Sequence, residues 1–255
     1  MGQTKLSVIE GGIAVLSVVR PEALNALSKD IVDEIDAQIE TVRRDADIRV
    51  LILYSEGNFA AGADIKVMAG CDEEQARAFI FSPTYDKISA LSIPVIAAIE
   101  GYALGGGMEL ALTADIRIAG ESAKMGFPEI TLGIMPGAGG TVRLPHIVGE
   151  PKAKELIFTG AIIAADEAAA IGLVNRTVPD GEVFAEAEAL AAKLAKRAPI
   201  AMAAAKTAIH FSKDNAVAES IAAEAGAWAK LFNSEDQKEG MQAFLEKRKP
   251  VFRNK

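Results

Sequence analysis

The chain has 255 residues, and half of them are apolar, which is enough to bury a substantial core. Its 35 acidic and 27 basic residues give a net charge of −8, so the chain as a whole has no electrostatic attraction to nucleic acid or to an anionic membrane. The single cysteine, Cys71, cannot form an internal disulfide, which is typical of a reducing compartment. No signal-peptide pattern and no apolar stretch of membrane-spanning length is present, so we expect a cytoplasmic protein.

The predicted elements alternate between strands and helices over the first 180 residues. In chain order they are a hairpin of residues 6–9 and 13–19, a helix capped by Ser28, strand 50–54, a loop to residue 63, helix 73–91, strand 94–99, turn 101–107, helix 108–114 and strand 116–119. This alternation predicts an α/β fold with largely parallel strands. From about Gly181 the strand signals end, and Ala-rich segments predict helices as far as Lys249. We therefore expect a core of residues 1–180 and a helical region of residues 181–255.

Several common catalytic patterns are absent from the sequence. There is no G-x-S-x-G and no Walker A motif, and the glycine runs at 105–107 and 137–140 do not complete G-x-G-x-x-G. These absences argue against serine hydrolysis, nucleotide hydrolysis and dinucleotide-dependent redox chemistry. The two histidines, His146 and His210, have no ligand pattern beside them, so we expect no metal site.

Glu109 is the first candidate for chemistry. Glycines 105–107 precede a short apolar helix, whose first backbone N–H groups have no partner inside the helix and favour an anion. Glu109 follows Gly106 by three residues, a spacing that places its carboxylate on the same helix face as the Gly106 amide. Its apolar neighbours should desolvate it and raise its pKa. A glycine-rich turn with a glutamate at its solvent edge is an equally good interpretation of these residues alone.

Glu129 is the second candidate acid, and it also lies in an apolar setting, between Pro128 and Ile130. Two carboxylates that converge on one site repel each other, so one tends to hold a proton while the other is ionised. Such a pair is suited to acid–base catalysis. The residues alone leave open whether the two acids converge or whether Glu129 is an ordinary surface residue.

Several segments together resemble the crotonase superfamily. They are 62–66 (GADIK), 94–98 (PVIAA), 101–107 (GYALGGG), 128–130 (PEI), 136–141 (PGAGGT), 239–241 (EGM), 243–244 (AF) and 246–248 (EKR). The resemblance covers essentially the whole chain and is strongest to the enoyl-CoA hydratase branch. It implies a spiral core of repeated ββα units, followed by a C-terminal helical region that forms trimers, often paired into hexamers.

The resemblance also implies roles for individual residues. The backbone N–H groups of Ala63 and Gly106 would form an oxyanion hole for the thioester oxygen of an acyl-CoA. Glu109 would activate water for attack at C3, and Glu129 would deliver a proton to C2, in a reversible syn-type addition to a 2-enoyl-CoA. The remaining contacts to CoA would come from Ala61, Asp64, Ile65, Lys66 and, from a neighbouring subunit, Lys247. No metal or redox cofactor is implied, because the substrate itself carries the coenzyme A.

The choice of branch depends on three positions. Isomerase members generally need only the acid at Glu129, so the presence of both acids favours a hydratase. Thioester hydrolases of the superfamily have Asp after the proline of the later loop, where this chain has Gly137. The alternatives that remain are an enoyl-CoA isomerase, a hydratase of a cyclic dienoyl-CoA and, disfavoured by the acidic charge, a non-catalytic RNA-binding member.

The acyl specificity is not fixed by any motif. Met68, Met125, Ile134 and Met135 are candidates for the wall of an acyl pocket. We expect each of them to be a core residue instead, because flexible methionine side chains commonly fill gaps in a core.

Overall fold

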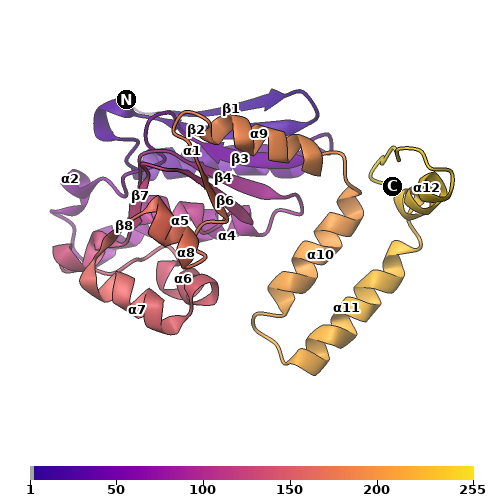
Figure 1. Cartoon of the computed structure of the whole chain (residues 1–255). Helices are drawn as coiled ribbons and strands as arrows, with labels where there is room; N and C mark the ends of the chain where they lie inside the picture. The colour runs from indigo at the N-terminus through magenta and orange to yellow at the C-terminus, as the bar shows by residue number, and fades with distance from the viewer. Residues whose placement is uncertain (1–2) are drawn as a thin grey trace.

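The structure is a computed structural model that describes residues 3–255, apart from the side chain of Ala78. In chain order the elements, with η marking a 3-10 helix, are β1 (Gln3–Ile9), β2 (Ile13–Val19), η1 (Pro21–Ala23), α1 (Lys29–Arg44), β3 (Val50–Tyr54), α2 (Ile65–Met68), α3 (Glu73–Ala76), η2 (Arg77–Phe79), α4 (Ser82–Ser89), β4 (Val95–Ile99), β5 (Tyr102–Leu104), α5 (Gly106–Ala111), β6 (Ile116–Gly120), β7 (Lys124–Gly126), η3 (Pro128–Leu132), α6 (Gly140–Val148), α7 (Glu150–Thr159), β8 (Ile162–Ala164), α8 (Ala165–Ala170), β9 (Arg176–Val178), α9 (Val183–Leu194), α10 (Pro199–Phe211), α11 (Val217–Leu231) and α12 (Glu235–Leu245). Figure 1 shows the sheets and most of the helices in one body, with α10, α11 and α12 to one side.

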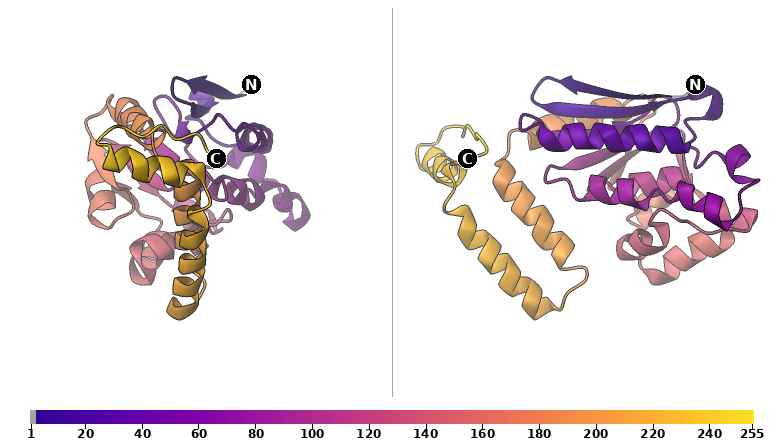
Figure 2. Two further views of the ribbon diagram at one scale, coloured as in Figure 1. Left: turned by 90° about the vertical axis from the view of Figure 1, so that its right-hand side faces the viewer. Right: turned by 180° about the vertical axis from the view of Figure 1, so that it is seen from behind.

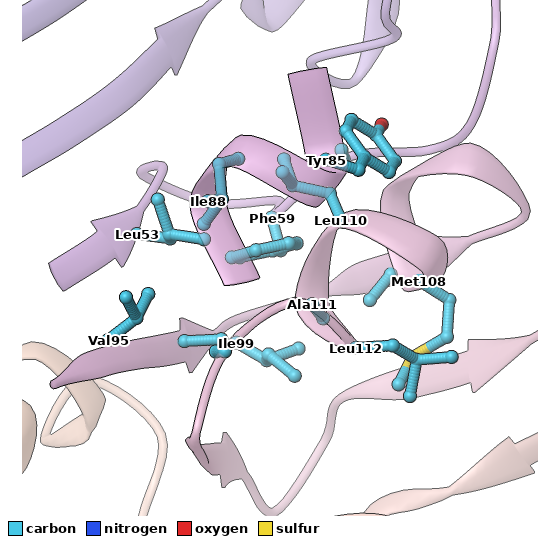
Figure 3. Close-up of a cluster of buried hydrophobic side chains, with 14 of the residues drawn as sticks. Leu53, Phe59, Tyr85, Ile88, Val95, Ile99, Met108, Leu110, Ala111 and Leu112 are labelled. Atoms are coloured by element: carbon cyan, nitrogen blue, oxygen red, sulfur yellow. The ribbon is translucent and has the colours of Figure 1, made fainter. Parts of the chain in front are cut away.

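A six-stranded sheet in the order β1-β2-β3-β4-β6-β9 forms the centre of the described chain. β1 and β2 are the predicted antiparallel hairpin, and every later pair in this sheet is parallel. β3 and β4 are continuous apolar runs because both faces of the sheet are covered. α9 packs on one face through Val183, Ala187 and Ala191. On the other face, α4 and α5 pack against each other and against residues of β3 and β4 (Figure 3).

A second sheet, in the order β5-β7-β8, gives the fold its spiral form. After β4 in the large sheet, the chain forms β5 in the small sheet and then the helix α5. After β6 it forms β7 in the small sheet and then η3 and α6. Each of these two turns contributes a strand to each sheet and then a helix, which agrees with the predicted ββα spiral. The three-residue strands of the small sheet were not predicted, because segments this short carry too little periodicity.

Two predicted elements differ from the structure. The helix expected over residues 73–91 is divided into α3, η2 and α4, with Ile80 extended between the last two. Pro83 explains the break, because proline has no N–H to donate to the carbonyl of Phe79 four residues earlier, yet it fits the first turn of a new helix. The turn expected over residues 101–107 contains β5, and α5 begins at Gly106 rather than at Met108. Gly105, with φ 48°, turns the chain sharply enough for this early start.

The C-terminal region is helical from α9 to α12, as predicted. α9 lies on the large sheet, whereas α10 and α11 form an antiparallel pair that extends away from the sheets (Figures 1 and 2). This pair presents large apolar side chains to solvent, including Ile209, Val217, Ile221 and Trp228, each at least 60% exposed. The boundary at residue 180 and the role of these helices in trimer formation stay predictions.

Candidate active site

One cavity of about 210 Å³ brings together the four residues that the sequence placed in a catalytic site. Ala63 comes from the loop after β3, Gly106 and Glu109 from α5, and Glu129 from η3. The loop after β3 is held in place because Ala60 pairs with Ala103 of β5. The spiral of the two sheets therefore brings three segments that are distant in sequence to the wall of one cavity.

Ala63 and Gly106 each present a backbone N–H at this cavity. Gly106 is the first residue of α5, so its N–H has no partner within the helix. Within residues 3–255, neither N–H donates a hydrogen bond to the protein. A Cβ placed on Gly106 would lie 3.8 Å from the backbone nitrogen of Ala63, so the two donors are close neighbours. This pair can bind one partially negative oxygen.

The glycines on either side of Gly106 are required by close contacts. A Cβ on Gly107 would lie 2.1 Å from the carbonyl oxygen of Ala60, so only glycine lets α5 approach the loop this closely. A Cβ on Gly105 would lie 2.8 Å from Oε1 of Glu129. The triple glycine thus brings the loop of Ala60 and the carboxylate of Glu129 close to the start of the helix.

Glu109 is held in a fixed position by two backbone amides. Its side chain is only 3% exposed, and its Oε1 accepts hydrogen bonds of 2.7 Å from the N–H groups of Ala138 and Gly140. Burial raises the pKa of Glu109, as the sequence predicted, while these two N–H groups and the positive charge of Arg143 oppose the rise. The two backbone donors favour the ionised form of Glu109, whereas burial favours the protonated form.

Glu129 has the opposite environment. Its Oε2 is buried and finds no hydrogen-bond partner among the described residues. Burial raises the pKa of Glu129 to about 7, its own backbone N–H lowers it, and the nearby charge of Glu109 raises it further. The structure therefore places both acids at one cavity in different environments, with backbone donors on Glu109 and none on Oε2 of Glu129.

The loop of residues 61–66 lies at the edge of the same cavity, and its conformation is fixed from within the chain. Leu27 donates its N–H to the carbonyl of Gly62, and Asp64 donates its own to the carbonyl of Leu27. The Asp64 carboxylate accepts from the Lys66 N–H and pairs with Arg20 at 2.8 Å, which holds the Asp64 pKa low. The Asp64 carbonyl in turn accepts the Val67 N–H, so the side chain, N–H and carbonyl of Asp64 all have partners within the chain.

The other predicted CoA contacts divide into two groups. Ala61, Ala63 and Ile65 line the cavity, and Lys66 is exposed beside it. Lys247 is also exposed, but it follows α12, which lies at the far end of the molecule from α2 (Figure 1). Lys247 is not among the residues that line the cavity of its own chain, and its contact with CoA from a neighbouring subunit stays a prediction.

The four candidates for an acyl pocket also divide. Met125 is fully buried in the core, as expected. Met68, Ile134 and Met135 line the cavity instead, so the expectation that each is a core residue was wrong for these three. Met68 ends the four-residue helix α2, and Ile134 and Met135 lie in the irregular segment between η3 and α6.

Several residues that shape the site had no assigned role in the sequence. Ala138 and Gly140 supply the amides that bind Glu109, and Arg143 donates to the carbonyl of Ala138 at 3.1 Å. The phenol of Tyr85, fully buried, donates to the carbonyl of Gly106 at 2.9 Å. The glycine run at 137–140 was visible as a motif, but nothing in the sequence indicated which side chain its amides would bind.

Among residues 3–255, no three His, Cys, Asp or Glu side chains gather closely enough to hold a metal ion. None of the helices over the same residues is both long and apolar enough to cross a membrane.

Comparison with known proteins places this site in a family. A family model described as enoyl-CoA hydratase/isomerase matches residues 8–255. The chain is 43% identical over 244 residues to a short-chain-enoyl-CoA hydratase of Clostridium acetobutylicum, covering 94% of each chain. It is 43% identical over 250 residues to a crotonyl-CoA hydratase of Syntrophomonas wolfei, covering 96% of each.

Solved structures agree with these relatives. The crystal structure of an enoyl-CoA hydratase from Bacillus anthracis superposes with a TM-score of 0.96 at 40% identity, covering 99% of each chain. This fold match confirms the crotonase-like spiral over the whole chain, including its helical C-terminal region. Because the family match and the relatives both span nearly all of its length, the chain belongs to the enoyl-CoA hydratase/isomerase family of the crotonase superfamily.

Proposed function

We propose that this protein is an enoyl-CoA hydratase, which adds water across the 2,3-double bond of a 2-enoyl-CoA to give a 3-hydroxyacyl-CoA. The observation that carries the proposal is the pair of Glu109 and Glu129 in one cavity with two unpaired backbone N–H groups. The family and the names of relatives at 43% identity agree with it.

The chemistry follows from the different environments of the two acids. Glu109, ionised and fixed through Oε1, takes a proton from water through its other oxygen, and the water oxygen attacks C3. The electrons of the double bond move toward the thioester carbonyl, and Glu129 donates its proton to C2. The product gains one water molecule, and Glu109 finishes with a proton that Glu129 has lost. The family resemblance implies a syn-type addition, in which both new bonds form on the same face of the substrate.

The oxyanion hole stabilises the charge that this reaction creates. As C3 is attacked, negative charge builds on the thioester oxygen, and the N–H groups of Ala63 and Gly106 are positioned to receive it. Fixed donors need no rearrangement when the charge forms, and removal of one such donor typically costs about 3–4 kcal/mol of barrier. The same two donors would stabilise the enolate in the reverse reaction, dehydration.

The CoA part of the substrate is assigned to the loop of residues 61–66, with Lys66 near the phosphates and Lys247 supplied by a neighbouring copy. The separation of Lys247 from the cavity of its own chain supports an assembly of at least two copies (Figure 1). The exposed apolar faces of α10 and α11 support the trimer, or pair of trimers, that the family resemblance implies. Light scattering should give at least three times the chain mass of 26.8 kDa, and a stable monomer at micromolar concentration would contradict the assembly.

Turnover of crotonyl-CoA tests the function directly. We expect the purified protein, treated with a chelator and given no nucleotide, to hydrate crotonyl-CoA or a 2-enoyl-CoA of graded chain length. The readout is the loss of ultraviolet absorbance of the conjugated thioester, with mass spectrometry to detect the added water. If the protein only moves a 3-enoyl double bond, without adding water, it is an isomerase. If no 2-enoyl-CoA is hydrated, the proposed function is wrong.

A further inference from the structure

One face of helix α4 contacts both halves of the active site. The Tyr85 phenol donates to the carbonyl of Gly106, in the first turn of α5. The Ser82 hydroxyl donates to the carbonyl of Gly137 at 3.2 Å, and the Asp86 carboxylate forms an ion pair with Arg143. These three side chains are three and four residues apart, so they share a face of the helix. α4 therefore links α5 to the loop of residues 137–140, which binds Glu109.

The loop of residues 137–140 is built around two side chains. A Cβ on Gly140 would lie 3.0 Å from Oε1 of Glu109, which is the oxygen that receives the Gly140 N–H. Gly139 has φ 105°, and a Cβ there would lie 1.9 Å from Nη1 of Arg143. Gly140 therefore leaves room for the Glu109 carboxylate, and Gly139 leaves room for the Arg143 guanidinium.

Arg143 connects the loop of residues 137–140 to α4. Its side chain is 19% exposed, and Nη1 donates to the carbonyl of Ala138 at 3.1 Å while Nη2 pairs with Asp86. The peptide N–H of Ala138 donates to Glu109, so Arg143 fixes a residue that directly contacts the carboxylate. A guanidinium suits this position because its planar fork can hold two acceptors in fixed directions.

We propose that Arg143, held by Asp86, is a positioning residue that orients the Glu109 carboxylate and keeps it ionised. The proposal rests on the proposed function, in which Glu109 accepts a proton from water. Arg143 acts through the loop 137–140 and through its charge, and it takes no part in the proton transfers.

Three charged or titratable groups face Glu109 from the elements around it. Arg143 of α6 lowers the Glu109 pKa by its positive charge. The Tyr85 phenol of α4 is fully buried, and burial raises its pKa well above the ordinary value, so it stays neutral. Glu129 of η3 holds a proton below about pH 7. Asp86 lies on the solvent side of Arg143, with a side chain 70% exposed. Arg143 is thus the cation that opposes the desolvation of Glu109.

The test compares Arg143→Met and Arg143→Lys with the matched control Arg43→Met. Arg43 pairs with Glu40 on the exposed surface of α1 and is not among the residues that line the cavity, so its loss tests only the general effect of removing an arginine. Methionine at position 143 removes both the charge and the fork, whereas lysine keeps the charge alone. Glu109 is titrated in the free protein by carbon NMR of labelled glutamate, with Glu109→Gln identifying its signal.

In Arg143→Met we expect the Glu109 pKa to rise by about one pH unit, and the acidic limb of kcat to move upward by the same amount. We expect kcat to fall about 10–100-fold with little change in KM, because a displaced base slows the chemistry and not the binding. Arg143→Lys should show the smaller pKa change but a clear loss of kcat, and Arg43→Met should match the parent.

A merely structural role for Arg143 would lower the melting temperature without moving the Glu109 titration. If Glu109 titrates as in the parent in folded Arg143→Met, the proposal is wrong. Should methionine prevent folding, a kcat of Arg143→Lys equal to that of the parent would overturn the proposal. The NMR titration needs no turnover. A parent protein that fails to hydrate any 2-enoyl-CoA would overturn the proposed function, while the titration would still decide whether Arg143 controls Glu109.

Discussion

The pH dependence of hydration follows from the two carboxylates and can be worked out before any measurement. Hydration needs Glu109 ionised and Glu129 protonated, and dehydration needs the reverse arrangement. Both directions therefore require the pair to hold one proton in total. Burial raises the Glu129 pKa to about 7, whereas two backbone amides and Arg143 oppose the rise at Glu109. We predict a bell-shaped profile for kcat/KM, with its alkaline limb near pH 7 in both directions.

The loss of activity at alkaline pH follows the fraction of enzyme in which the pair of carboxylates still holds one proton. Above the limb, each further pH unit removes about 90% of the singly protonated form, so activity at pH 9 should be about 100-fold below its maximum. Below the acidic limb both acids are protonated and no base remains. The assay measures kcat/KM from initial rates at low substrate concentration, with crotonyl-CoA for hydration and 3-hydroxybutyryl-CoA for dehydration. A range of about pH 5–10 covers both limbs of the predicted profile.

Two results would refute this reasoning. A rate that stays flat through pH 9 would mean that no group with a pKa near 7 donates the proton. Alkaline limbs that differ between the two directions by more than about one pH unit would mean that the pair does not share one proton in the free enzyme.

Three further predictions rest on close contacts and on burial. Gly106→Pro removes an oxyanion donor and should lower kcat about 100–1,000-fold, with the affinity for CoA little changed. Gly106→Ala keeps the N–H, and its Cβ would have no contact closer than 3.8 Å, so this variant should keep most activity. Gly107→Ala should be strongly destabilised in thermal denaturation, because its Cβ would lie 2.1 Å from the Ala60 oxygen; a melting temperature equal to that of Gly106→Ala would contradict the packing. Glu129→Gln should stabilise the protein more at pH 8 than at pH 4. The folded pKa of Glu129 is raised, so its contribution to stability is present below its unfolded pKa of 4.5 and is lost as the pH rises to about 7; calorimetry at both pH values checks this.

The large sheet was predictable from the sequence because its strands carry strong local signals. β3 and β4 are unbroken apolar runs, and the two glycines at 11 and 12 mark the β1–β2 hairpin, both with positive φ. The helix α1 begins where Ser28 was expected to cap it, and the Ser28 oxygen accepts the Ile31 N–H. Hydrophobic periodicity and helix capping depend on residues that are close in sequence, so both can be recognised without the structure.

The small sheet and the divided helix were not predictable in the same way. β5, β7 and β8 have three residues each, and their pairing depends on which segments the spiral brings side by side. Residues 73–91 have helical composition throughout, and only Pro83 gave a signal for the break between η2 and α4. These features are decided by tertiary contacts, which composition does not record.

The candidate site was predictable in its residue types but not in its support. The four positions Ala63, Gly106, Glu109 and Glu129 came from glycine spacing and from the family resemblance, and the structure places all four at one cavity. The amides of residues 138 and 140 that bind Glu109 carry no side-chain chemistry, so no residue type identifies them. Arg143 lies in a helix that the sequence left without a role.

The central claim is that Glu109 handles the water and Glu129 handles the C2 proton, and deuterium exchange at C2 tests it most directly. Exchange of a C2 proton in a bound acyl-CoA needs an acid–base group at C2 and the oxyanion hole, but no attack by water. Glutamine preserves size and much of the hydrogen bonding, so each variant isolates a proton transfer that is typically worth about 10²–10⁴-fold.

Exchange and hydration are measured by NMR in deuterated buffer, across pH because loss of one carboxylate changes the pKa of the other. The account predicts that Glu109→Gln nearly abolishes hydration yet keeps measurable C2 exchange, while Glu129→Gln loses both. If Glu129→Gln kept exchange and Glu109→Gln lost it, the two roles would be reversed and the account contradicted.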